Sequence, residues 1–150
     1  MKGRSAGGVH AYRAVHAGSG ILDIVVSLYD CIIVDLMQAQ EARVTQQFDR
    51  EFMCLQSASH RLLGLRSALD EDRGGALVKR LDVFYATASY HISAIPRRPD
   101  PVSASNRLLR QMRAMRAAWS QVASGQTPVL KLHSAHDSGI RPVKDLNVVL

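Results

Sequence analysis

Apolar residues recur at helical spacing in four long stretches of the chain. Residues three and four positions apart share one face of an α-helix, so this spacing predicts amphipathic helices. Stretches rich in Gly and Pro separate the four segments, and no long segment alternates between apolar and polar residues as a strand would. The pattern therefore predicts helices over about residues 21–42, 47–69, 75–94 and 103–123.

Each of the last three predicted helices has one apolar side, which we expect to face a common core. In the second helix this side is formed by Phe48, Phe52, Leu55, Ser59, Leu62 and Leu69. In the third helix it is formed by Leu77, Leu81, Phe84, Tyr85, Ala88, Ile92 and Ile95. In the fourth helix it is formed by Leu108, Leu109, Met112, Met115, Trp119 and Val122.

Four helices of about 20 residues with short connections pack most simply as an antiparallel up-and-down four-helix bundle. We therefore predict an all-α fold with a single bundle domain over residues 1–124, which includes an N-terminal strap at 1–18. Residues 125–150 mix Gly, Pro, Ser and His, a composition that predicts a flexible C-terminal tail.

The first predicted helix is apolar over an unusually wide arc. Placed at 100° per residue, its apolar side chains cover roughly 220°, whereas a bundle helix needs little more than about 100°. One interpretation is that the strap around Tyr12, or the C-terminal tail, covers the second apolar face. The other is an exposed groove that accepts an amphipathic helix of another protein, and a strap displaced by a client would satisfy both. Burial of this apolar face in a homodimer is a further interpretation.

The net charge of +6 comes from the last third of the chain. Residues 1–95 carry 10 basic and 10 acidic side chains, whereas residues 96–150 carry 9 and 3. This surplus raises nucleic-acid binding as an alternative function, because cationic side chains bind phosphate backbones. No aromatic residues for base stacking are interleaved with the arginines, and solvation of the fourth helix explains them too, so we do not expect nucleic acid as the main partner. The arginines concerned are Arg97, Arg98, Arg107, Arg110, Arg113 and Arg116.

The polar residues supply no convergent set for catalysis. The six histidines are scattered, and the pair at positions 133 and 136 has no third metal ligand beyond Asp137. Three carboxylates share one edge of the first helix, which is typical of a solvated face. These carboxylates are Asp23, Asp30 and Glu41. We therefore expect no enzyme activity, no metal and no cofactor.

The N-terminal residues indicate where the protein resides. Two early cations have no apolar run behind them, which argues against a secretory signal. The first apolar run, at 21–37, is interrupted by three aspartates and is too charged to span a bilayer. We expect a cytoplasmic protein without membrane insertion. Its two cysteines, Cys31 and Cys54, lie within helical patterns and are expected to be small buried residues.

Motifs along residues 10–123 resemble the FliS family of flagellin export chaperones. Residues 24–30, IVVSLYD, are similar to the family's L-V-x-M-L-Y-D signature. Residues 67–77, SALDEDRGGAL, are similar to its S-L-D-x-E-x-G-G-E-I-A joint between helices two and three. Tyr12 lies where the N-terminal family tyrosine is expected. The closing L-x-x-L-R-x-x-W is similar to Leu109, Met112, Arg113 and Trp119, with three more residues between the arginine and the tryptophan.

The sequence also departs from the family pattern. The helix-starting proline of the family's T-A-S-P is replaced in the run Gly18 to Ile21. The L-Y-D-Y-M of the third helix is FYATA at 84–88, which keeps the aromatic pair and loses the second tyrosine and the acid. These changes are compatible with the predicted bundle. A client other than flagellin stays an alternative.

The resemblance implies a cytosolic chaperone that binds the C-terminal segment of flagellin, prevents its premature polymerisation and delivers it to the flagellar type III export apparatus. The candidate client-binding residues are Tyr12, Leu28, Tyr29, Leu77, Leu81 and Tyr85. Tyr12 and its strap are expected to cover part of the groove in the free state. Because the bundle core needs the same side chains, core packing stays an alternative for each of them.

Overall fold

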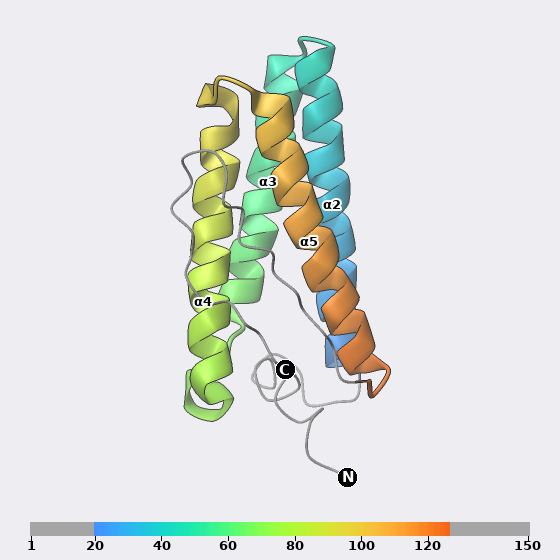
Figure 1. Cartoon of the computed structure of the whole chain (residues 1–150), viewed down its shortest axis with the longest axis vertical. Coiled ribbons are helices and arrows are strands. Elements are labelled where there is room, and N and C mark those ends of the chain that lie inside the picture. Colours follow the sequence, from blue (N-terminus) through green and yellow to red (C-terminus); the bar gives the residue numbers. More distant parts are fainter. Residues whose placement is uncertain (1–19, 127–150) are drawn as a thin grey trace.

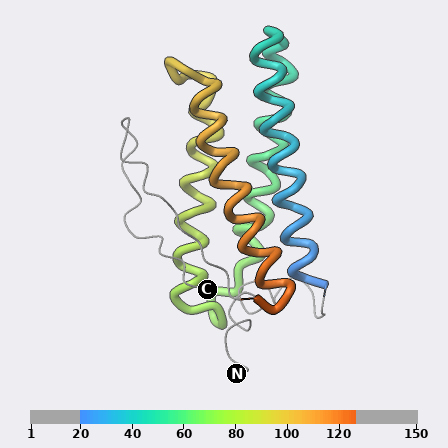
Figure 2. The backbone as a smooth tube through the Cα atoms, turned by 45° about the vertical axis from the view of Figure 1, so that its right-hand side comes forward, coloured from blue at the N-terminus to red at the C-terminus, as the bar shows by residue number. Residues whose placement is uncertain are grey.

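The computed structural model describes residues 20–126. Within that range the chain forms four long helices and a short 3-10 helix, which run up and down in an antiparallel bundle (Figures 1 and 2). The predicted all-α bundle is confirmed. The predicted strap, and the tail from residue 127 onwards, lie outside the described residues. The helices are α2 (Ile21–Val44), α3 (Phe48–Ser67), α4 (Glu71–Ala94), η1 (Ile95–Arg97) and α5 (Pro101–Ala123).

The position of α2 in the bundle explains most of its wide apolar arc. This helix packs closely against both α3 and α5, whereas α4 packs mainly on α3 and meets α5 less closely. Burial on two flanks needs apolar residues over more of the helix surface than burial on one. Ile24, Val34 and Met37 nevertheless stay exposed on α2.

Two helices begin earlier than predicted because an aspartate caps each of them. The Asp70 carboxylate accepts a hydrogen bond from the Arg73 backbone N–H at 3.2 Å and starts α4. The Asp100 carboxylate accepts one from the Ser103 N–H at 3.0 Å and starts α5, and hydrogen bonds to Ser103 hold the pKa of Asp100 below its usual value. Side-chain oxygens satisfy backbone donors that have no partner inside the helix. The helix starts expected at residues 75 and 103 therefore move to 71 and 101.

The core is built from the predicted faces of α4 and α5 almost unchanged. All six predicted α5 residues are buried, and α4 buries the predicted set except Leu77, which is partly buried beside the core residue Val78. The two cysteines do not fit their predicted burial, because Cys31 is exposed and Cys54 is only partly buried.

The inward face of α3 differs from the predicted one. Phe48 and Phe52 are 53% and 65% exposed. The position between them in the core is taken by Glu51, whose carboxylate accepts a hydrogen bond from Arg43 Nε at 2.9 Å. A carboxylate is tolerated in a core when a cation pairs with it, and here the ion pair joins α2 to α3. The buried residues of α3 are Glu51, Leu55, Ala58, Leu62 and Leu65.

No helix among residues 20–126 is both long enough and apolar enough to cross a membrane.

Gly75 bends α4 shortly after its start, with φ 53° and ψ −134°. Side chains with a Cβ rarely adopt this conformation, so replacing Gly75 with Ala should lower the free energy of unfolding by about 1–3 kcal/mol. Gly64 in the interior of α3 is the matched control, because an added Cβ meets no atom within 4 Å at either position. Gly64→Ala should raise the free energy of unfolding by about 0.5–1 kcal/mol, since Ala favours helix. Chemical denaturation measures both, and changes of the same sign would contradict the account.

Candidate functional site

Three of the predicted client-binding residues lie together in the core. Tyr29 from α2 and Tyr85 from α4 are both 0% exposed, and the Tyr29 hydroxyl donates to the Tyr85 hydroxyl at 2.9 Å. Their ring centroids are 6.4 Å apart. Leu81, one turn before Tyr85, belongs to the same buried cluster. The two tyrosines therefore join helices that are not direct neighbours in the bundle.

Trp119 of α5 completes this group, and we call Tyr29, Tyr85 and Trp119 the aromatic cluster. Burial raises the pKa of Tyr29 well above its usual value, and the neighbouring Tyr85 adds to the increase. The Trp119 indole acts in the opposite direction on the pKa of Tyr29 and offsets part of this increase. Polar groups inside a core are tolerated when each finds a partner, so the cluster fixes how α2, α4 and α5 sit relative to one another.

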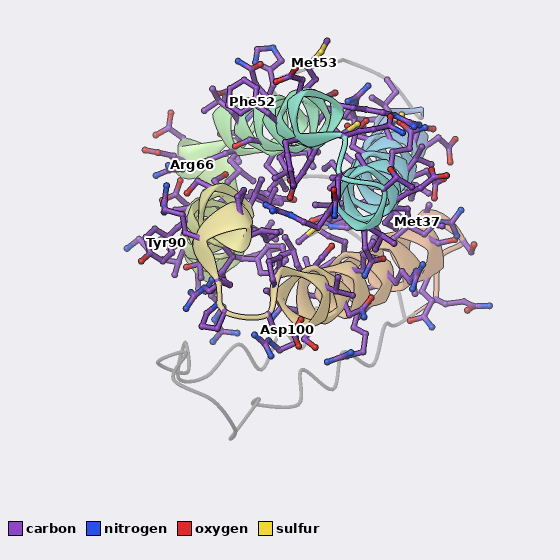
Figure 3. The ribbon with its side chains drawn as sticks, turned by 90° about the horizontal axis from the view of Figure 1, so that it is seen from above. Met37, Phe52, Met53, Arg66, Tyr90 and Asp100 are labelled. Carbon is purple, nitrogen blue, oxygen red and sulfur yellow. The ribbon has the colours of Figure 1, made fainter. Side chains whose placement is uncertain are left out.

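The other predicted client-binding residues differ in their surroundings. Leu28 and Leu77 are partly buried and pack against the edge of the core. They come from α2 and α4, which occupy opposite corners of the bundle when it is seen along its axis (Figure 3). Tyr12 lies outside the described residues. Leu28 and Leu77 thus reach the surface in this state, while Tyr29, Leu81 and Tyr85 do not.

Large apolar side chains on the outside of α3 and α4 were not predicted from the sequence. We call the following four the outer apolar set: Phe52 at 65% exposure, Leu63 at 54%, Val83 at 48% and Tyr90 at 64%. Helical periodicity puts Phe52 and Leu63, eleven positions apart, on one face of α3, and Val83 and Tyr90, seven apart, on one face of α4. Seen along the bundle axis, Phe52 and Tyr90 both point outward on the side where α3 and α4 pack together (Figure 3).

An exposed ion pair joins α3 to α4 beside Leu63 and Val83 of this outer apolar set. The Arg66 guanidinium donates from Nε and a terminal nitrogen to the two oxygens of Asp82, at 2.6 Å and 3.2 Å. This paired arrangement lowers the pKa of Asp82. The two helices therefore offer a joined surface on which apolar side chains flank one neutralised charge pair.

The candidate chemical residues form no site within the described part of the chain. Among residues 20–126, no three His, Cys, Asp or Glu side chains come close enough to hold a metal ion. The carboxylates of the first helix are exposed, as predicted, and two of them pair with arginines: Asp30 with Arg116 and Glu41 with Arg50. The histidines at 133 and 136 lie outside the described residues.

The observed architecture defines a class, that of all-α bundles with a closed core and apolar side chains displayed on the outer helix faces. Residues 17–126 match the family model described as Flagellar protein FliS. Because this match covers most of the chain, the chain belongs to the FliS family of flagellar chaperones. No curated protein and no solved structure matches the chain significantly.

Removing the Tyr29 hydroxyl should destabilise the bundle, because it removes the hydrogen bond to the buried Tyr85 hydroxyl. We expect Tyr29→Phe to lower the free energy of unfolding by about 1–3 kcal/mol. In a double-mutant cycle with Tyr85→Phe, the coupling energy should be about 0.5–3 kcal/mol, as for residues in direct contact. Urea denaturation of the four proteins measures it. Strictly additive effects would show that the hydroxyls do not depend on each other.

Proposed function

We propose that this FliS-family protein is a cytoplasmic export chaperone for the C-terminal segment of flagellin. Binding keeps the client from polymerising early, and the complex delivers it to the flagellar type III export apparatus. Family membership supports the flagellar role. The observation that carries the binding role is the outer apolar set, because monomeric proteins rarely display several large apolar side chains along one face without a partner.

The outer apolar set suits a client segment that becomes helical as it binds. An amphipathic helix places apolar residues at intervals of three, four and seven, and can lie along the joined surface of α3 and α4. A segment that is unfolded before binding loses conformational entropy when it orders, so a complex of moderate affinity that can be released later is expected. Such release is what an export chaperone requires.

The residues predicted from the sequence form a second contact set in this proposal. Leu28 and Leu77 reach the surface at the core edge, and Tyr12 precedes α2 in the chain. Tyr29, Leu81 and Tyr85 support these edges from inside the core. A client that wraps around the bundle would contact both the outer apolar set and the core edge.

Substitutions on the outer apolar set should weaken flagellin binding without unfolding the protein. We expect Phe52→Ser/Tyr90→Ser to raise the Kd for a flagellin C-terminal peptide by at least about tenfold, since each buried aromatic contributes about 1.5–3 kcal/mol. Ile24→Ser is the control, because Ile24 is also exposed but lies in the first turn of α2, at the opposite end of the bundle from Phe52 and Tyr90 (Figure 1). It should change the Kd less than about twofold. Isothermal titration calorimetry, with circular dichroism as the folding check, measures these effects.

The same titrations separate the parts of the proposal. Absence of binding to any flagellin from the same organism would contradict the flagellin assignment. Normal binding by Phe52→Ser/Tyr90→Ser, combined with lost binding by a folded Leu28→Ser/Leu77→Ser variant, would move the client from the outer apolar set to the core edge.

A further inference from the structure

The arginines in the first part of the bundle and those in its last part differ in their ion-pair partners. Between Ile21 and Arg73, five arginines form ion pairs with carboxylates. Beyond Ile95, the described residues contain six arginines and a single acidic residue, Asp100. Only Arg116 of these six forms an ion pair there, with Asp30 at 2.9 Å. The arginines left without an ion pair among residues 20–126 are Arg97, Arg98, Arg107, Arg110 and Arg113.

Several of these cations meet where α4 ends and α5 begins. The charges of Arg98 and Arg107 both reach His91, on the last turns of α4, and lower its pKa after the larger effect of its burial. The helix η1 and the turn that follows it bring Arg97 and Arg98 to this point of the chain. We call His91, Arg97, Arg98, Arg107 and Arg110 the arginine corner.

The arginine corner contains a buried hydrogen-bond donor that has no acceptor. Arg107 Nε is shielded from solvent and lacks a hydrogen-bond partner within the described structure. The charge of the nearby Asp100 interacts with that of Arg107, but the Asp100 carboxylate accepts its hydrogen bond from the Ser103 N–H and none from Arg107 Nε. A buried donor without an acceptor is costly, and a rotation of the partly exposed Arg107 side chain would let an incoming carboxylate satisfy it.

We propose that the arginine corner docks an acidic protein segment, rich in Asp and Glu, that is distinct from the apolar client. Guanidinium groups bind carboxylates through two parallel hydrogen bonds, so a cluster of arginines selects such a segment by geometry as well as charge. Nucleic acid fits less well, because η1 and α5 expose no aromatic side chain, and the exposed aromatic beside the arginine corner, Tyr90, already packs edge-on against His91.

The arginine corner adjoins the outer apolar set but consists of other residues. Tyr90 belongs to the outer apolar set and its neighbour His91 to the arginine corner, and their ring centroids are 5.7 Å apart. An acidic segment bound here would therefore lie at one end of the client surface. Both partners could occupy the bundle together.

The proposal is tested by fluorescence anisotropy with the full-length chain and a labelled Asp/Glu-rich peptide. Arg98→Glu/Arg107→Glu should raise the Kd by at least about tenfold, because two charge-assisted contacts become repulsions. Arg50→Glu/Arg73→Glu makes the same change in net charge at arginines that already have carboxylate partners. This control should raise the Kd less than about threefold at an ionic strength near 0.15 M, where distant charges are screened.

A second variant keeps the test valid if substitution of the partly buried Arg107 unfolds the protein. Arg97→Glu/Arg110→Glu changes two exposed members of the arginine corner and should also weaken peptide binding by at least about tenfold. A single-stranded oligonucleotide with the same number of charges is titrated in parallel. Unchanged peptide binding in both variants, or equal weakening by the Arg50/Arg73 control, would overturn the proposal. Tighter binding of the oligonucleotide that is lost in the arginine-corner variants would overturn it in favour of nucleic acid.

Discussion

The bundle depends on satisfying three polar aromatic side chains inside an otherwise apolar core. Tyr29, Tyr85 and Trp119 come from α2, α4 and α5, and each brings a polar group that would be costly to bury alone. Apolar packing tolerates small shifts between helices, whereas the 2.9 Å hydrogen bond between the Tyr29 and Tyr85 hydroxyls does not. The aromatic cluster therefore selects one arrangement of the helices among the many that apolar contact alone would permit.

Because the core is closed, partner segments can bind only on the outer surface of the bundle and at the edge of the core. Apolar side chains on α3 and α4 lie around the Arg66–Asp82 pair, and unpaired arginines gather where α4 gives way to α5. These surfaces suit different ligands, an amphipathic client segment and an acidic segment. Within residues 20–126 the arginines thus differ by position: those between Ile21 and Arg73 pair with carboxylates, and most of those beyond Ile95 do not.

Helical spacing was sufficient to predict the fold class and the inner faces of α4 and α5, because those faces are apolar apart from the buried Ser105 of α5. It failed on α3, where Glu51 is buried and Phe52 beside it is exposed. Hydrophobicity assigns a phenylalanine to the core and a glutamate to solvent, and only the partner Arg43, on another helix, reverses this. The helix starts were missed for a related reason, since Asp70 and Asp100 act through capping rather than through the apolar pattern.

The candidate site was predictable only in part. Resemblance to the FliS motifs singled out Tyr29 as important, and helical spacing gave both Tyr29 and Tyr85 a core position as one alternative. Their mutual contact depends on α2 and α4 facing each other across the bundle, which no local pattern specifies. The most direct test of the closed-core account is the emission of Trp119, the single tryptophan of the chain, during titration with a tryptophan-free flagellin C-terminal segment. The account predicts that the complex forms with the emission maximum and quencher access unchanged. A red shift with quencher access like that of the unfolded chain would contradict it.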